Sequence, residues 1–351
     1  MGNHLAQASR RMGWDVVVVD RDPAALERMK DDIYPKRYGA WDPAIELYPG
    51  DRAPRGGFDV ICIGTPPNGR MRLALEALAE KPRVLQLEKP LCEPTPDCGL
   101  GEFVAAYRAQ RDTVVVVGYD HVVSESIVFV VELLRQTAIG EVETIEVEWG
   151  ADSKAILLAH PWLHGIADTY LGFWRLGGGA SGEHSHALHL WRYLAKNAGL
   201  GRWTRMSAFM DLRREGEAEY DRLAVFSFLT DTGKAGTVVQ DMVTFPQRSR
   251  AFIQGQDGFI EWLCNGRPEG DLVRYRSGSG DIVEQCFPKK RPDDFHREML
   301  HIAEILAGRV SADESPLSLQ GGIDVIQVLR AAHEHRNQGV EIRHEAADPL
   351  C

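Results

Sequence analysis

The sequence of 351 residues lacks the features that mark membrane and nucleic-acid-binding proteins. It contains no run of roughly eighteen apolar residues, so no segment is long enough to form a membrane-spanning helix. It has no excess of basic residues: the formal net charge is -11, which disfavours nucleic acid and anionic membranes as partners. Its first residues also lack the apolar core of a secretory signal peptide.

Cysteine is scarce and scattered along the chain. The six cysteines form no Cys-x-x-Cys pair and no dense framework like those that hold small secreted domains together. Scattered thiols in a chain of this size are typical of a reducing compartment, so we predict a cytoplasmic protein. Hydrophobic residues make up 44% of the chain and charged residues 26%, an ordinary globular composition that can supply two domains with cores.

Apolar segments alternate with helical segments over the first 120 or so residues. Strands at this spacing, separated by helices, predict right-handed βαβ units in a doubly wound parallel sheet of the Rossmann type. The four consecutive valines at 16–19 predict a strand that is buried on both faces. The predicted strands are 15–20, 59–63, 83–87 and 112–117, and the predicted helices are 5–12, 23–31, 68–80 and 97–110.

The pattern changes after residue 121, which divides the chain into predicted domains 1–121 and 122–351. Alternating polar and apolar residues predict a large, open and mainly antiparallel sheet in an α+β C-terminal domain. An open sheet face is usually covered, so a homodimer or homotetramer is expected. The predicted helices of this domain are 125–138, 184–196, 293–308 and 318–336, and its strands are 142–149, 203–211, 222–230, 235–243, 251–254, 257–263 and 271–276.

Asp20 ends the strand of four valines. An acidic side chain at this position of a dinucleotide-binding sheet accepts hydrogen bonds from the adenosine ribose and repels a 2′-phosphate, so NAD is favoured over NADP. Arg21 is expected to lie against the adenine. Gly2 opens the first helix eighteen residues before Asp20, which is the register of the third glycine in a GxGxxG fingerprint.

The strand and the first two glycines of such a fingerprint do not occur before Gly2. We therefore expect the first strand and the start of the glycine-rich loop to be encoded upstream, with Met1 an internal residue of that loop. The alternative is a fragment that binds cofactor weakly or not at all.

Two further strand ends carry candidate cofactor-binding residues, because ligands bind at the carboxyl ends of parallel strands. Partial burial beside a nicotinamide ring would lower the pKa of Lys89 toward a range useful for proton transfer. An ordinary turn and a surface lysine are the alternative interpretations. The two segments are Gly64-Thr65-Pro66-Pro67-Asn68 and Glu88-Lys89-Pro90.

The Glu-Lys-Pro motif after a Thr-Pro-Pro loop resembles the Gfo/Idh/MocA family of oxidoreductases, in which the lysine of the motif is catalytic. Gly118-Tyr119, Ile139-Gly140-Glu141-Val142, Gly177-Gly178-Gly179 and the C-terminal helices resemble the family in the same order, so the resemblance covers nearly the whole chain. It implies hydride transfer between NAD and a secondary alcohol of a sugar, cyclitol or sugar derivative.

The segment after the triple glycine departs from the family's pattern of an Asp, a His four residues later and a second Asp three residues after that. Here Glu183, His186 and His189 stand at intervals of three, which places them near one helix face. The resemblance implies that His186 transfers a proton and that Glu183 orients the substrate or Lys89. His189 then replaces the negative partner of His186.

Other interpretations of these histidines are open. Glu183, His184, His186 and His189 could bind a metal such as Zn²⁺, or the histidines could be structural, but the HExxH spacing of many zinc sites is absent. We predict no metal. Aromatic faces and an arginine suit a sugar. The residues expected to bind substrate are Tyr119, Trp162, Arg175 and His189. Asp120 follows Tyr119 at the end of a parallel strand and is expected, with it, to form the floor of the site.

Two alternative functions use the same fold. A non-catalytic NAD-binding regulator would be marked by the loss of catalytic residues, and the presence of Lys89 with a nearby histidine argues against it. An NAD-dependent lyase or glycosidase would oxidise its substrate only transiently, and product analysis would distinguish it from a dehydrogenase.

Overall fold

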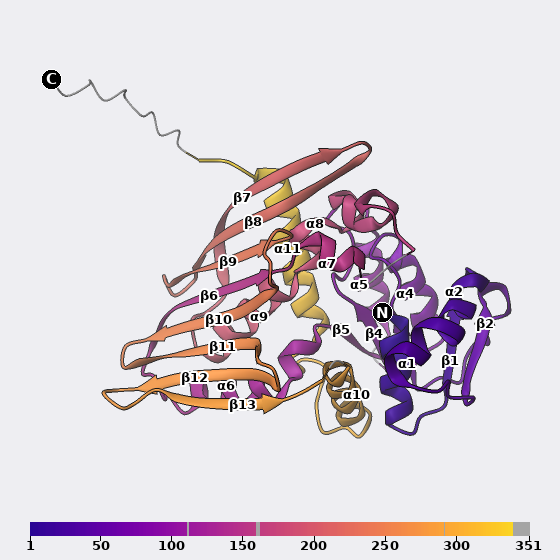
Figure 1. Ribbon diagram of the computed structural model, residues 1–351, viewed down its shortest axis with the longest axis horizontal. Coiled ribbons are helices and arrows are strands. Elements are labelled where there is room, and N and C mark those ends of the chain that lie inside the picture. Colours follow the sequence, from indigo (N-terminus) through magenta and orange to yellow (C-terminus); the bar gives the residue numbers. More distant parts are fainter. Residues whose placement is uncertain (111, 159–161, 291, 340–351) are drawn as a thin grey trace.

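The computed structural model describes residues 1–110, 112–158, 162–290 and 292–339. These residues form an N-terminal unit with parallel strands and a second unit built on an eight-stranded sheet (Figure 1). The large sheet lies on the left of Figure 1 and the parallel unit on the right, with helix α10 (Asp293–Leu306) between them. The predicted α/β fold class is confirmed.

The parallel strands of the N-terminal unit form two sheets. The first has the order β1-β2 and the second has the order β3-β4-β5. The strand β2 was not predicted; it is short and ends in a proline. The strands are β1 (Val16–Asp20), β2 (Ile45–Pro49), β3 (Val60–Ile63), β4 (Val84–Glu88) and β5 (Val114–Gly118), and the helices are α1 (Gly2–Arg11), α2 (Pro23–Arg28), a π-helical turn (Met29–Ile33), α3 (Tyr34–Tyr38), α4 (Arg70–Ala79) and α5 (Leu100–Ala109).

The prediction that β1 is buried on both faces is wrong. Val16, Val17 and Val18 are only partly buried, and Val19 is 44% exposed. Within the described ranges β1 hydrogen-bonds to β2 alone and β3 to β4 alone, so β1 does not lie inside a continuous sheet. The strand β4 is paired on both sides and is buried along its whole length. The expected upstream strand stays a prediction.

The eight-stranded sheet has the order β13-β12-β11-β10-β6-β9-β8-β7. Its neighbours are antiparallel except for the parallel pair β6 and β9, so the predicted mainly antiparallel sheet is confirmed. The short β13, which alone among these strands was not predicted, lies at the edge of the sheet. The strands are β6 (Val142–Gly150), β7 (Trp203–Glu215), β8 (Ala218–Thr230), β9 (Ala235–Asp241), β10 (Arg248–Gly255), β11 (Gly258–Arg267), β12 (Gly270–Ser277) and β13 (Val283–Pro288).

The two faces of this sheet differ in chemistry. Helices α6 (Glu125–Arg135), α9 (His186–Asn197) and α11 (Leu319–His335) pack on one face, over a core that includes Trp191, Phe226 and Trp262. The side chains that point to the opposite face of the sheet form ion pairs, such as Arg250–Glu148 at 2.8 Å and Arg274–Glu261 at 3.0 Å. Phe209 and Leu229 on the same face are exposed as well, at 50% and 38%, and the predicted oligomer stays a prediction.

The C-terminal segment returns to the N-terminal unit. The carbonyl of Leu317 accepts a hydrogen bond of 2.8 Å from the amide of Val117, and Ser318 forms an antiparallel bridge with Val116 on β5. The domain division at residue 121 stays a prediction. In the part of the chain that the structure describes, none of the helices has the length and apolarity needed to cross a membrane.

Candidate active site

The carboxyl ends of β1 and β3 carry the residues predicted to bind the adenosine and phosphate parts of a cofactor. Asp20 is exposed, and one of its carboxylate oxygens accepts the amide of Asp22 at 2.9 Å. Arg21 follows it and is exposed as well. A Cβ atom placed on Gly64 would lie 3.2 Å from the amide nitrogen of Gly2, at the start of α1. The fold therefore brings the two predicted glycines together, and a larger residue at 64 would fill the space between them.

The loops after β3 and β4 are joined by a buried arginine that the sequence analysis missed. Arg70, at the start of α4, is 1% exposed, and its guanidinium donates to the carbonyl oxygens of Thr65, Glu88 and Pro90. Nothing in the local sequence distinguishes it from Arg72, which faces solvent on the same helix. In the first loop Thr65, Pro66 and Asn68 are exposed and Pro67 is buried, while Pro90 is buried in the second.

The triple glycine lies against the same loops. A Cβ atom on Gly177 would come within 2.6 Å of the ring of Pro67 and 3.6 Å of Pro90. Gly177 also has a φ of +87°, which favours glycine. The absence of a side chain at this position therefore allows the second unit to approach the two loops, and it brings α8 (Gly179–Glu183) to the end of β4.

Lys89 and Glu183 meet at this junction. The side chain of Lys89 is only 9% exposed, and its Nζ donates to the carbonyl oxygen of Glu183 at 2.6 Å and to Oε2 at 3.2 Å. The hydroxyl of Tyr170 donates to the same Oε2 at 3.0 Å. Burial opposes ionisation of Glu183, but the charge of Lys89, followed by His184, outweighs it and lowers the pKa of the carboxyl. Glu183 is therefore a carboxylate at neutral pH, and it forms an ion pair with Lys89.

Glu88 turns into the interior rather than toward the open side of the site. It is 2% exposed, and the side-chain amide of Gln86 donates to it at 3.3 Å and to Glu298 of α10 at 3.0 Å. Burial raises the pKa of Glu88 and that of Glu298, because neither carboxyl is solvated. In this arrangement Glu88 shapes the strand end that carries Lys89.

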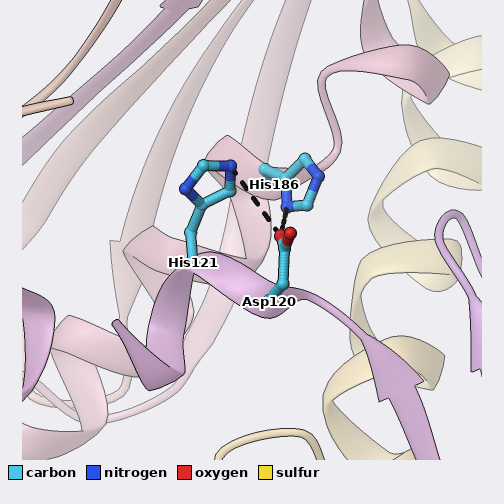
Figure 2. Close-up of side chains that lie close together, drawn as sticks. All are labelled: Asp120, His121 and His186. Atoms are coloured by element: carbon cyan, nitrogen blue, oxygen red, sulfur yellow. Dashed lines mark ion pairs between the residues drawn. The ribbon is translucent and has the colours of Figure 1, made fainter. Parts of the chain in front are cut away.

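His186 lies beside Asp120, which was predicted to form the floor of the site, and beside His121, which was not predicted. Figure 2 shows Asp120 and His121, from the turn after β5, with the imidazole of His186 at the start of α9. Asp120 Oδ1 is 3.9 Å from His186 Nδ1 and 3.8 Å from His121 Nε2. Burial is the largest cause that lowers the pKa of His186, and the nearby His121 and Lys89 lower it further. His186 is therefore neutral at pH 7, with a carboxylate close to one ring nitrogen.

The prediction that Glu183 and His186 share one helix face is wrong. Glu183 ends α8, and α9 begins at His186 after a turn at residues 184–185. The two side chains still border one site, because the charge of Lys89 acts on the titration of both. The negative group beside His186 is Asp120, which comes from a different element than the family pattern implies.

Tyr119 and His189 form a buried wall behind His186. Their rings stack with centroids 4.0 Å apart, and Tyr119 meets His186 edge-on at 5.7 Å. Tyr119 is 1% exposed and His189 is 0% exposed, so both support the site from inside the fold. Their predicted contact with substrate stays a prediction.

The two other residues predicted to bind substrate lie on the surface. Trp162 is 39% exposed, and the guanidinium of Arg28 lies 5.5 Å from its ring centroid. Arg175 is exposed and lies 4.1 Å over the ring of Trp174. The neighbouring His160 and Pro161 lie outside the described residues.

Among the described residues, one group brings three possible metal ligands together. Atoms of Asp120, His121 and His186 lie within 4.8 Å of one another. Two nitrogen ligands of one tetrahedral zinc lie about 3.4 Å apart, given bonds of roughly 2.1 Å. The separations of 3.8 and 3.9 Å are wider than that. The cluster considered from the sequence, which included Glu183, His184 and His189, is not gathered in this way.

No family model matches the chain, and no curated protein matches it in sequence. Solved structures do match its fold. A levoglucosan dehydrogenase in complex with NADH matches with a TM-score of 0.71 at 16% identity, over 95% of this chain and 93% of that one. An aldose-aldose oxidoreductase from Caulobacter crescentus, complexed with glycerol, matches with a TM-score of 0.66 at 19% identity, over 91% and 88%.

The WlbA dehydrogenase from Bordetella pertussis, solved with NADH and UDP-GlcNAcA, matches with a TM-score of 0.65 at 18% identity, over 94% of this chain and 91% of that one. At such identities the likeness defines a fold. The chain thus has the two-unit fold of these dehydrogenases, in which a Rossmann-like parallel unit precedes a large mixed sheet.

Proposed function

We propose that the protein is an NAD-dependent oxidoreductase that transfers a hydride between the cofactor and a secondary alcohol of a sugar, cyclitol or sugar derivative. The observation that carries the proposal is the convergence of Lys89, Glu183 and His186 at the carboxyl end of β4. Lys89 contacts Glu183 there, and burial lowers the pKa of the nearby His186, at the edge of the sheet where dinucleotide folds bind ligands.

The residues present fit NAD. Gly2 and Gly64 themselves place no side chain at the start of α1, where backbone amides can receive a pyrophosphate. The exposed carboxylate of Asp20 suits the two hydroxyls of an adenosine ribose and disfavours a 2′-phosphate. Several matching structures were solved with NADH or NAD⁺, which supports the same cofactor here.

The bound cofactor would supply the hydride acceptor or donor. Lys89 Nζ donates a hydrogen bond to the substrate oxygen, and Glu183 holds the ammonium in place. His186, neutral at pH 7, offers a ring nitrogen to the hydroxyl proton. Once His186 is protonated, the nearby Asp120 carboxylate stabilises its charge. In the reverse direction Lys89 again donates a hydrogen bond to the substrate oxygen, and His186 returns the proton to it.

The substrate class is supported by the matching structures, which include complexes with levoglucosan, L-sorbose and glycerol. We also propose that the protein is cytoplasmic and forms a homodimer or homotetramer. Light scattering would measure its oligomeric state.

The direct test is NADH formation by the purified chain across a panel of neutral sugars and cyclitols, with NAD affinity measured in parallel. Turnover of at least one member supports the proposal. Tight NAD binding without turnover of any member would favour the regulator instead. Transient NADH with a redox-neutral product would identify a lyase or glycosidase. Absence of NAD binding would overturn all three.

A further inference from the structure

The loop that follows Lys89 brings two cysteines into contact. The Sγ atoms of Cys92 and Cys98 lie 3.4 Å apart. Both side chains are buried, with Cys98 at 5% exposure, whereas Pro96 and Asp97 at the tip of the same loop are exposed. A disulfide has a sulfur–sulfur distance of about 2.05 Å. The two sulfurs therefore need to approach by only about 1.3 Å to form one.

Cys98 is the more reactive member of the pair. Its sulfur accepts hydrogen bonds from Cys92 and from the guanidinium of Arg330 on α11 at 3.7 Å. The amide of Leu100, at the start of α5, also points to it. The hydrogen bond from Cys92 is the largest cause that lowers the pKa of Cys98, to about 6, while the pKa of Cys92 is raised. At neutral pH Cys98 is a thiolate, the reactive form, and Cys92 keeps its proton.

We propose that Cys92 and Cys98 are a peroxide-sensitive modification site that closes to a reversible disulfide. The Cys98 thiolate attacks one oxygen of hydrogen peroxide and the O–O bond breaks, which gives a sulfenic acid and hydroxide. The sulfur of Cys92 then attacks the sulfenic sulfur, and the S–O bond breaks. The hydroxyl leaves with the proton of Cys92 as water. The two sulfurs lose two electrons to the peroxide, and a dithiol reductant restores both thiols.

The site lies directly behind the proposed catalytic lysine. Cys92 is three residues after Lys89, and Arg70 holds the intervening backbone through the carbonyls of Pro90 and, at 3.4 Å, Leu91. The change in conformation that brings the two sulfurs together must therefore occur within residues 92–98, because the segment before them is held by Arg70. Disulfides in a reducing compartment are usually transient and redox-sensing, which is the behaviour expected of this pair.

The test is peptide mapping of the full chain after treatment with hydrogen peroxide at pH 7. The peptide that contains both cysteines should lose two hydrogen atoms and regain them with dithiothreitol. The Cys92→Ser variant should instead accumulate a sulfenic acid at Cys98 that dimedone traps, and Cys98→Ser should give neither product. Cys286→Ser is the matched control, because Cys286 is exposed on β13 and its loss should leave the pair's oxidation unchanged.

The mapping uses neither NAD nor substrate, so its outcome is independent of the proposed reaction. A peroxide dose that oxidises Cys286 while Cys92 and Cys98 stay reduced would overturn the proposal. So would the lack of a dimedone adduct in a Cys92→Ser protein that melts at the temperature of the unaltered chain. If that variant fails to fold, the mapping of the unaltered chain decides alone.

Discussion

The Nζ atom of Lys89 lies 2.6 Å from the carbonyl oxygen of Glu183 and 3.2 Å from its Oε2, across 94 residues of sequence. The contact joins the end of β4 in the N-terminal unit to the end of α8 in the second unit. Both side chains are largely withdrawn from solvent, at 9% and 23% exposure. The ion pair thus holds the Lys89 side chain at the junction of the two units.

Replacing this lysine tests the proposed reaction. The Lys89→Met variant should bind NAD with nearly unchanged affinity and lose about two to four orders of magnitude in turnover, the usual contribution of a proton-transfer group. Steady-state kinetics and calorimetry measure the two effects separately. Lys196→Met, on the exposed end of α9, is the control. Retention of most activity by Lys89→Met would show that the lysine has another role.

Asp20 should determine the choice of cofactor. Asp20→Ser should weaken NAD binding by roughly ten- to a hundredfold, because a charged hydrogen bond contributes about 1.5–3 kcal/mol. The same change removes the repulsion of a 2′-phosphate, so the difference between the affinities for NAD and NADP should become smaller. Calorimetric titration of both cofactors measures this, with Asp15→Ser just before the same strand as the control. Tighter binding of NADP by the unaltered protein would contradict the assignment.

Arg70 should be structural and indispensable. Arg70→Met leaves the buried carbonyls of Thr65, Glu88 and Pro90 without their donor, and each lost partner costs roughly 1–3 kcal/mol. We expect a loss of several kcal/mol in the free energy of unfolding, measured by urea denaturation. The exposed Arg72→Met on the same helix should cost far less. Equal stability of the two variants would show that water replaces the guanidinium.

Asp221 should make stability depend on pH in a defined direction. Its buried carboxylate accepts from the amide of Ser181 at 2.7 Å and from the hydroxyl at 3.0 Å, but burial raises its pKa to about 6. The folded state therefore binds a proton that the unfolded state has already released between pH 4 and 6. Stability falls as the pH rises through this window, by at most about 3 kcal/mol.

The Asp221→Asn variant should lack this slope. Urea unfolding at intervals between pH 4 and 7 measures the difference between the variant and the unaltered chain. The exposed Asp281→Asn serves as the control. If the free energies of unfolding of Asp221→Asn and of the unaltered chain changed with pH in parallel, the pKa of Asp221 would not be raised in the folded state.

Zinc should be absent from the active protein. The ligand atoms of Asp120, His121 and His186 are more widely spaced than those of a tetrahedral site, so elemental analysis should find far less than one zinc per chain. Chelators should leave turnover unchanged. One bound zinc per chain, lost in His121→Ala, would assign these residues to a metal centre instead.

Much of the fold followed from local patterns. The apolar runs at 59–63, 83–87 and 112–117 became β3, β4 and β5 within two residues at each end, because a short apolar run between turn residues is typical of a buried strand. The Glu-Lys-Pro motif predicted where the candidate site lies, since its position at a strand end is also a local property.

The tertiary structure alone decided which side chains surround that position. Arg70 looks like any helical arginine, His121 occurs in an ordinary turn, and Cys92 and Cys98 appear merely scattered in the sequence. The partial exposure of the four valines depends on how β1 is paired, and the break between Glu183 and His186 depends on packing around the triple glycine. Local sequence determines periodicity, whereas the burial of side chains and the formation of ion pairs depend on segments that meet only when the chain folds.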